Sequence, residues 1–528
     1  MECLPSMKTV FIDSMGFLFL TAVILLAGGG RSMSEKAYKP KEMNEMLVIN
    51  EDNSHFFGSR TEDQMTLEGL HAFVNQYADT CVTHLFLCPN AMRASFRSES
   101  RDAIWDPVNG VEPEHKWPKN AKLLHERGLD PYFVWIERCR ERGISPWLTQ
   151  RMNDIHSVDE RDNFMHSTFW RENPEYWRVP EGSASPWQNR AMNYAHPEVR
   201  DHQMAFVREL LDRYDPDGIE LDWMRFGYHL TPGKEDEEGP ILTAFVRKVR
   251  ELTVKAGEKR GHPVLLSARV PAHPDAAKGL GMDGVLWARE GLVDLLVPCP
   301  FWSSSDFDIP VELWLERLGD AASRVEVAPG IEHNARPWPG GKAVGNDLAS
   351  LVGFVVSSRY RGAKSLYLFN WMDSETRPVS SSQYGTLLTQ GLGPKTVLSS
   401  RRRHPVCYRD TVPPGVSANV RLPIDSLSGE KVAIPIGPKP TTGEAFLVLG
   451  LAKKEDAALA KIAAFLNGQE LVRAGDIADL SAMGGSPACA LRFTIPLDVL
   501  RDGHNEVQVR QTEGPSQQIV WMEIEIKP

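Results

Sequence analysis

Cysteine is scarce in this sequence, with seven residues in 528, and neither a CxxC pair nor an HExxH motif occurs. So few cysteines exclude a disulfide-stabilised scaffold. The spacing of possible ligands predicts no catalytic metal, and no motif predicts a cofactor. Cys81, Cys88, Cys139 and Cys299 lie in apolar segments, where buried free thiols are expected.

Positive charge is also in short supply. Lys and Arg number 59 against 70 Asp and Glu, which gives a formal net charge of -11. Proteins that bind a phosphate backbone usually carry a basic patch, so no nucleic-acid partner is expected. The short basic stretch "SSRRRH" (399–404) is interpreted as an interdomain segment.

Long hydrophobic runs are absent except near the N-terminus, where "GFLFLTAVILLAGGG" occupies residues 16–30 and follows Lys8. Its apolar part is shorter than the roughly 20 residues that span a bilayer, and small residues follow it. This pattern is typical of a signal peptide. The sequence therefore predicts a signal peptide over 1–30, a linker over 31–45, and a mature protein exported to the periplasm or medium without a membrane partner. An uncleaved segment that anchors the protein is the alternative.

Between residues 46 and 394, short apolar runs alternate with helical patterns such as "HPEVRDHQMAFVRELLDRY" (196–214). Eight such units predict an α/β fold of the (β/α)8 TIM-barrel type. A doubly wound open sheet is the alternative, although no glycine-rich phosphate loop follows the first run. The predicted strands are residues 46–50, 83–89, 145–152, 218–223, 263–270, 294–300, 324–330 and 365–371.

From residue 395 to 528 the chain consists of β-rich stretches separated by Gly and Pro, such as "EAFLVLGLA", "ALRFTIPLDVL" and "QQIVWMEIEI". This pattern of short β-rich stretches predicts an antiparallel β-sandwich of the jelly-roll kind. Such a module can bind carbohydrate or can serve only as a packing partner.

The stretch "DGIELDWMRF" (217–226) contains two carboxylates inside an apolar run. At a period of two, Glu220 and Asp222 leave the predicted strand on one face, and the large apolar side chains leave it on the other. An edge strand with a solvated face is the simplest alternative.

In a barrel, catalytic groups lie where strands end at the C-terminal face. The strand ends here carry polar and aromatic groups in unusual number. Single members have structural explanations, since His55 could be a core histidine, Asp154 a helix cap and Arg269 the partner of Asp222. The candidates are His55, Asn90, Asp154, His156, Glu220, Asp222, Trp223, Arg269, Trp302, Glu332, Asn370 and Trp371.

A long polar insertion, "FWRENPEYWRVPEGSASPWQNR" (169–190), follows the third predicted strand. Long loops in compact domains are often functional. Its aromatic residues, Trp170, Tyr176, Trp177 and Trp187, suit the apolar face of a pyranose, and about half of them are expected to anchor the loop instead.

Residues 196–226, together with "LLSARVPAHPDAAKGLGMDGVLWAREGLVDLLVPCPFW", resemble the glycoside-hydrolase-like (β/α)8 barrels of bacteria (family 10-like), in which a strand of the form D-G-I-x-L-D-aromatic-x-R follows a helix. The strand is also similar to the chitinase D-G-x-D-x-D-W-E strand, with Met224 in place of the final acidic residue. It is similar as well to the amylase-type strand that ends in a nucleophilic Asp, here Asp222, but no acidic residue matches that clan's strand-five acid beside Arg269.

The resemblance implies hydrolysis of a glycosidic bond in a poly- or oligosaccharide by two carboxyl groups. Asp222 and Glu332 are the predicted pair, and Asp154 is the alternative acid. Glu220 would orient Asp222 through Arg269. The other candidates are expected to contact substrate: His55, Asn90, His156, Glu220, Trp223, Arg269, Trp302, Asn370 and Trp371.

Two other functions stay open from the sequence. The first is a barrel that binds glycans without cleaving them, which the absence of an acidic residue at Met224 favours. The second is elimination across a uronic acid, with Arg269 neutralising the acid and His156 abstracting a proton.

Overall fold

The computed structural model describes residues 40–43, 45–180, 186–301, 304–371, 388–389, 397–412, 416–454 and 460–528. The predicted signal peptide and most of the predicted linker lie outside these residues, as do Trp302 and the predicted domain boundary at 394 and 395. Residues 39–528 form one compact unit. Within the described part of the chain, no helix has the length and apolar character needed to cross a membrane.

A curled parallel sheet forms the first part of the fold, and its strands follow the order β7-β6-β5-β4-β3-β2-β1-β11-β8. The barrel closes through the seventh predicted strand, which is split in two: β7 pairs with β6, and β8 pairs with β11. Both the predicted TIM barrel and its eight strands are confirmed. The strands are β1 (Leu47–Glu51), β2 (His84–Leu87), β3 (Ser145–Arg151), β4 (Gly218–Asp222), β5 (Leu265–Pro271), β6 (Leu295–Cys299), β7 (Glu326–Val327), β8 (Gly330–Glu332) and β11 (Leu366–Phe369).

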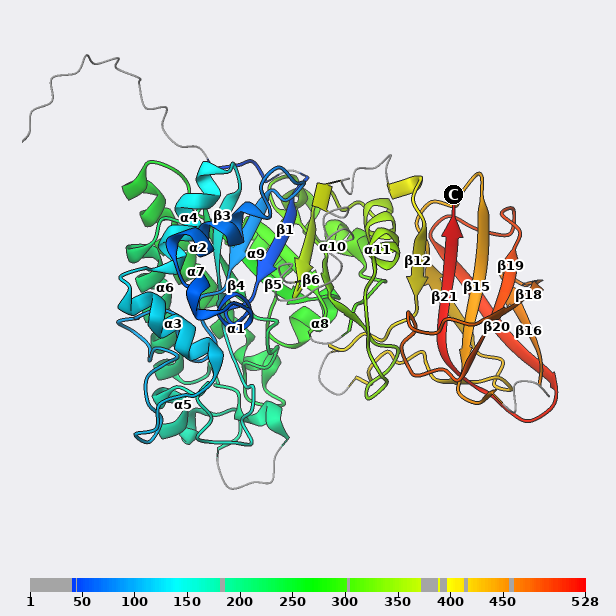
Figure 1. Ribbon diagram of the computed structural model, residues 1–528, viewed down its shortest axis with the longest axis horizontal. Helices are drawn as coiled ribbons and strands as arrows, with labels where there is room; N and C mark the ends of the chain where they lie inside the picture. The colour runs from blue at the N-terminus through cyan, green and yellow to red at the C-terminus, as the bar shows by residue number, and fades with distance from the viewer. Residues whose placement is uncertain are drawn as a thin grey trace, which may run out of the picture. The chain divides into compact units, whose positions relative to one another are not determined.

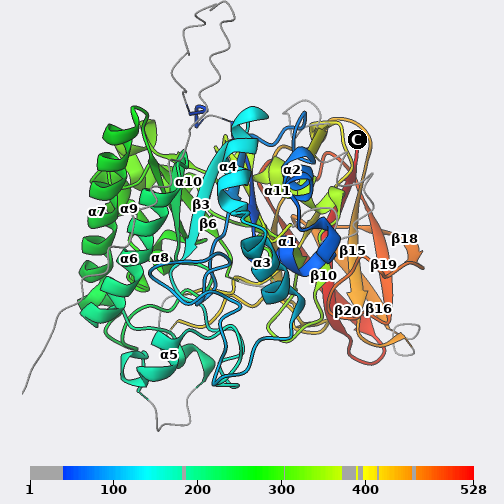
Figure 2. The same cartoon turned by 60° about the vertical axis from the view of Figure 1, so that its left-hand side comes forward.

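Helices surround this sheet, and Figure 2 shows α6, α7, α8 and α9 side by side on its outside. The predicted helix over 196–214 is confirmed as α6, which has Pro197 in its first turn. The helices are α1 (His55–Ser59), α2 (Leu67–Asn75), α3 (Lys116–Glu126), α4 (Pro131–Glu141), α5 (Thr168–Glu172), α6 (Pro197–Arg213), α7 (Glu235–Arg260), α8 (Pro274–Gly279), α9 (Gly284–Arg289), α10 (Val311–Leu318) and α11 (Leu348–Tyr360).

The second part is an antiparallel β-sandwich, as predicted, and its strands run from yellow to red in Figure 1. One sheet has the order β12-β21-β15-β19-β18, with β13 also paired to β21, and the other has the order β14-β20-β16-β17. The strands are β12 (Arg402–Pro405), β13 (Ile424–Asp425), β14 (Lys431–Pro435), β15 (Glu444–Leu451), β16 (Lys461–Leu466), β17 (Gln469–Glu470), β18 (Val472–Ile477), β19 (Cys489–Ile495), β20 (His504–Glu513) and β21 (Gln518–Lys527). A short pair of strands, β9 (Asn334–Ala335) and β10 (Val344–Gly345), follows β8.

The interpretation of residues 399–404 as an interdomain segment is wrong in its second half. Arg402 and Arg403 are buried in β12, which pairs with β21 inside the sandwich. Arg403 forms ion pairs with Glu523 at 2.8 Å and with Asp347, which caps α11, at 3.0 Å. A basic side chain with two carboxylate partners can be buried, and the sequence alone did not reveal those partners.

The six cysteines among the described residues are free thiols. Cys88, Cys139 and Cys299 are buried, as expected, whereas Cys81 is partly exposed.

Candidate active site

Two layers of inward-facing side chains cross strands β3, β4 and β5. The strand pairing aligns Thr149, Glu220 and Ser267 in one layer and Arg151, Asp222 and Arg269 in the next layer toward the C-terminal ends. Neighbouring residues in register point to the same side of a sheet. The two carboxylates therefore share the inner face of β4, as the alternation predicts.

Glu220 occupies the deeper layer and is fully buried. Its carboxylate accepts hydrogen bonds from the hydroxyls of Thr149 and Tyr367, both at 2.7 Å, and from Ser267 at 3.2 Å. Burial, together with the nearby charge of Asp222, raises the pKa of Glu220 to about 7. A carboxyl group enclosed in this way cannot contact a sugar, so the predicted substrate contact at Glu220 is not supported.

Asp222 lies one layer nearer the mouth and pairs with Arg269, whose Nε is 3.1 Å from Asp222 Oδ1. The same oxygen accepts hydrogen bonds from the backbone N–H groups of Met224 at 3.0 Å and Arg225 at 2.8 Å. Among the described residues, none donates a hydrogen bond to the other oxygen, Oδ2. One edge of the carboxylate is thus held in place, and the other is left for a ligand.

Arg269 is completely buried, and its guanidinium carbon lies 3.5 Å from the centroid of the Phe369 ring. Burial lowers the pKa of the Arg269 guanidinium, but the Asp222 carboxylate more than offsets this and holds the pKa above its ordinary value. Arg269 therefore fixes Asp222 and is shielded from any substrate, contrary to the predicted substrate contact.

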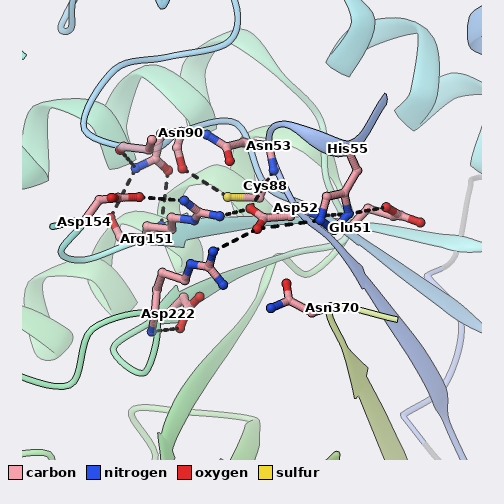
Figure 3. Close-up of polar contacts among 12 residues, drawn as sticks. Glu51, Asp52, Asn53, His55, Cys88, Asn90, Arg151, Asp154, Asp222 and Asn370 are labelled. Atoms are coloured by element: carbon pink, nitrogen blue, oxygen red, sulfur yellow. Dashed lines mark hydrogen bonds and ion pairs between the residues drawn. The ribbon is translucent and has the colours of Figure 1, made fainter. Parts of the chain in front are cut away.

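A second group of charges joins the ends of β1 and β3 (Figure 3). Arg151 bridges Asp52, in a very short ion pair, and Asp154, at 2.6 Å. Arg225 lies 3.3 Å from the second oxygen of Asp52. We refer to Asp52, Arg151, Asp154, Asp222, Arg225 and Arg269 as the acid–arginine cluster; its three acidic and three basic side chains are all nearly buried.

Asp154 also bonds His156, with 2.8 Å between Asp154 Oδ1 and His156 Nδ1. Burial raises the pKa of Asp154, but His156 and Arg151 together hold it well below the usual range. An acid with so low a pKa has no proton to give near neutral pH. The structure therefore does not support Asp154 as the alternative general acid.

His156 is the more accessible member of this pair, with 27% of its side chain exposed. Its Nε2 lies 3.2 Å from Arg225 Nη2. Because a carboxylate accepts and a guanidinium donates, Nδ1 carries the proton and Nε2 presents a lone pair. Burial lowers the pKa of His156, so the neutral form predominates.

Glu332 ends β8 and is aligned with Phe369, whose ring faces the barrel interior, so Glu332 points into the same mouth. Its carboxylate accepts a very short hydrogen bond from the backbone N–H of Asn334. It also accepts a hydrogen bond from Asn370 Nδ2 at 3.4 Å. Asn370 adopts a left-handed backbone conformation with φ 55°, which asparagine tolerates better than most residues.

Three further candidates take part in packing. Asn90 is fully buried, and its amide bonds the backbone of Ala91 and Arg151. Trp371 donates from Nε1 to the carbonyl oxygen of Ile331 at 3.2 Å. His55 is buried between Glu51, at 3.1 Å, and Asp52, at 3.8 Å.

Trp223 lies on the opposite face of the chain from Asp222. It is fully buried and packs against Tyr194, His229, Phe245 and Trp287. The predicted substrate contact at Trp223 is therefore wrong, and the alternation that placed Asp222 inward already implied this position.

The described residues of the insertion over 169–190 include both buried and partly buried aromatic residues. Trp170 and Trp177 are buried and stack with ring centroids 4.7 Å apart. Trp187 is only partly buried and lies within 6.0 Å of three other rings, those of Phe226, Tyr228 and Phe301. We refer to Trp187, Phe226, Tyr228 and Phe301 as the aromatic wall.

Sequence reasoning missed several members of these groups. Arg151 had a signal, because it lies two residues beyond Thr149 on the inward face of β3. Arg225, Phe226 and Phe301 follow the ends of their strands, where alternation no longer fixes direction. Within the described residues, no group of three or more His, Cys, Asp or Glu side chains is arranged to hold a metal ion.

No family model matches the sequence, and no curated protein matches it either. The similar solved structures include glycoside hydrolases. The glycoside hydrolase domain of PgaB (BpsB) from Bordetella bronchiseptica has a TM-score of 0.40 and 12% identity, over 66% of this chain and 99% of that one. An alpha-amylase from Lactobacillus plantarum has a TM-score of 0.36 and 12% identity, over 88% and 98%.

A cycloisomaltooligosaccharide glucanotransferase from Paenibacillus has a TM-score of 0.34 and 9% identity over 90% of this chain, which spans 57% of the transferase. These TM-scores are low, so the site's own geometry carries the functional argument.

Proposed function

We propose that this protein is a glycoside hydrolase that cleaves a poly- or oligosaccharide with Asp222 and Glu332 at the mouth of the barrel. The proposal rests on the different surroundings of the two carboxylate oxygens of Asp222. Arg269 and two backbone N–H groups hold its Oδ1, while no described residue hydrogen-bonds Oδ2. A carboxylate pinned in this way is prepared to act as nucleophile or base.

Glycosidic cleavage needs a second carboxyl group to protonate the leaving oxygen. Glu332 supports this role because it points into the same mouth from β8, on a different part of the barrel wall. Asn370, which donates to Glu332 Oε1, would orient the carboxyl group. Glu332 would deliver its proton to the glycosidic oxygen as the bond breaks, and Asp222 would act at the anomeric carbon or on a water beside it.

The remaining polar groups would position the pair. Arg269 keeps Asp222 in its orientation from the neighbouring strand β5 in the same layer, and Glu220 forms the hydrogen-bonded floor beneath both. His156 is the most accessible polar side chain of the group, and a sugar hydroxyl would bond its Nε2 by displacing Arg225. Asn370 would bond another hydroxyl.

A panel of aryl glycosides and polysaccharides tests the reaction class directly. In isotopically labelled water, hydrolysis places one labelled oxygen in each new reducing end, whereas elimination places none. Labelled reducing ends from any panel member would support the proposal. Glycan binding without turnover on the whole panel would favour the non-catalytic alternative.

Elimination across a uronic acid is the second candidate, and the Asp154–His156 pair favours it. His156 Nε2 presents a lone pair and lies beside Arg225, whereas the sequence suggested Arg269 as the cationic partner. Arg225 would neutralise the sugar carboxylate, and Nε2 would take the proton from the adjacent carbon. The electron pair of that C–H bond then forms the C=C bond, the glycosidic C–O bond breaks with its electrons going to the oxygen, and the leaving oxygen takes up a proton from the protonated His156 or from water. Ultraviolet absorbance of an unsaturated product, absent in His156→Gln, would establish this reaction.

Export is also part of the proposal, since the apolar run over 16–30 has signal-peptide character. N-terminal sequencing of the protein recovered outside the cytoplasm tests it. A mature N-terminus near residue 31 would support cleavage, and an intact N-terminus in the membrane fraction would support the anchored alternative.

A further inference from the structure

The aromatic wall combines three loops that follow different barrel strands. Trp187 comes from the insertion after β3, Phe226 and Tyr228 follow β4, and Phe301 follows β6. Trp187 and Phe301 are nearly parallel, with ring centroids 6.0 Å apart and an interplanar angle of 18°. Phe226 approaches Phe301 at 5.5 Å. Four rings from distant parts of the sequence thus form one surface.

This surface is continuous with the acid–arginine cluster. The Phe226 ring meets His156 edge to face at 4.8 Å, and His156 bonds both Asp154 and Arg225. Phe226 is buried, whereas Trp187, Tyr228 and Phe301 are only partly buried. The wall therefore begins at the polar site and becomes more exposed toward the β3 and β6 loops.

A segment at the start of the sandwich holds the β6 loop in place. Asp410 Oδ2 accepts a hydrogen bond from the Phe301 backbone N–H at 2.7 Å. Arg409 Nε donates to Asp306 at 2.8 Å, and Ser304 donates to the Tyr408 carbonyl oxygen at 3.3 Å. These contacts fix the position of the Phe301 ring.

We propose that the aromatic wall binds a second pyranose ring of the glycan whose bond is cleaved at Asp222. The proposal rests on the proposed function and specifies the substrate class: oligosaccharide chains rather than single-sugar glycosides. Flat rings pack against the apolar C–H face of a pyranose, and the polar side chains of the acid–arginine cluster lie beyond His156 at one end of the wall. Binding energy from this remote ring would be used at the reacting bond.

The test uses a homologous series of oligosaccharides of increasing length, derived from the best substrate of the panel. For the wild-type protein we expect kcat/KM to rise about tenfold or more when the chain becomes long enough to reach the wall, the size of effect that one apolar contact supplies. In Trp187→Leu, which keeps apolar volume but removes the flat ring, we expect the ratio of long-chain to short-chain kcat/KM to fall close to one. Trp187→Phe should restore much of the ratio.

Phe133→Ala is the matched control, because Phe133 is an aromatic residue that is 57% exposed and belongs to α4, which is outside the three loops that carry the wall. Circular dichroism checks that each variant is folded. Asp410→Ala gives a second way to disturb the wall without changing any of its rings. It should also reduce the ratio, because Phe301 loses its backbone partner.

A wild-type protein whose kcat/KM does not depend on chain length would overturn the proposal, as would a ratio unchanged in Trp187→Leu and Asp410→Ala. If no panel member is hydrolysed, the proposed function fails separately. Calorimetric binding of the panel polysaccharides then tests the aromatic wall alone: affinity lost in Trp187→Leu and kept in Phe133→Ala supports sugar binding by the wall, and equal affinity in all variants, or binding of no polysaccharide, contradicts it.

Discussion

Arg269 Nε lies 3.1 Å from Asp222 Oδ1, on adjacent strands of the barrel and with Arg269 wholly buried. Neither charge is tolerable without the other, because an unpaired ion in the interior costs several kcal/mol of desolvation. The pair also gives the carboxylate a fixed orientation, since Arg269 and two backbone N–H groups converge on the same oxygen.

Arg269→Met should therefore destabilise the protein by about 3–5 kcal/mol, the cost of leaving a buried partner charge uncompensated. The free energy of unfolding from urea titration measures this. Adding Asp222→Asn to Arg269→Met should recover a large part of the loss, because the double variant has no unpaired charge. If the double variant loses as much unfolding free energy as the two single variants together, the ion pair between Arg269 and Asp222 does not explain the destabilisation.

Glu220 should make stability depend on pH in a direction opposite to that of an ordinary carboxylate. Its folded-state pKa, about 7, lies above the ordinary value of 4.5. Below pH 4.5 it is protonated in both states and has no effect. As the pH rises from 4.5 to 7, Glu220 releases its proton only in the unfolded state. The free energy of unfolding therefore falls by up to about 3 kcal/mol.

The isosteric variant Glu220→Gln should not show this loss. The unfolding free energy of wild type minus that of Glu220→Gln should fall between pH 4.5 and 7 and then level off. A constant difference across that range would contradict the raised pKa.

The two classes of tryptophan in the 169–190 insertion should respond differently to mutation. Trp170 is buried and stacked, and its Nε1 donates to the Arg190 carbonyl oxygen at 2.8 Å, so Trp170→Ala should cost about 3–5 kcal/mol. Trp187→Ala should cost much less, because the ring is partly exposed. Thermal denaturation and limited proteolysis of the insertion measure the stability of the two variants. An equal loss of stability in Trp170→Ala and Trp187→Ala would contradict the assignment of Trp170 as an anchor and Trp187 as part of the aromatic wall.

Gly218 is required for packing inside the barrel. A Cβ there would overlap the Trp147 ring, which stacks on Phe86 with centroids 4.7 Å apart. Gly218→Ala should cost about 1–3 kcal/mol as an overpacked core. Gly58→Ala is the control: no atom lies within 4 Å of its added Cβ, and it should be neutral or slightly stabilising in α1.

The sequence predicted the barrel strands because buried parallel strands are short apolar runs bounded by helices and turns. The seventh strand differs, since Ala328 and Pro329 separate β7 from β8 and let each part pair with a different neighbour. Pro329, which has no N–H for the ladder, and Gly330 mark this break in the sequence, but they do not reveal which neighbour each part pairs with.

The candidate site could be predicted only within the strands, where side chains alternate between the inner and outer faces of the barrel. Within β4 this alternation places Glu220 and Asp222 on one inward face, with Glu220 the deeper of the two. It does not reveal the hydroxyl groups of Thr149, Tyr367 and Ser267 that enclose Glu220, so a substrate contact was still expected there. Beyond the strand ends, direction depends on tertiary contacts. For that reason Arg225, Phe226, Tyr228 and Phe301 were missed, whereas Trp187 was singled out from the composition of its loop, and Asn90 was taken for a ligand contact.

The most direct test of the central claim is the kcat/KM of Asp222→Asn on the best substrate of the panel, beside wild type and the folded control Phe133→Ala. Loss of at least about a thousandfold, with circular dichroism unchanged, is expected if Asp222 is the reacting carboxylate. Activity within about tenfold of wild type would contradict that role, because a reacting carboxylate cannot be replaced by an amide at so small a cost.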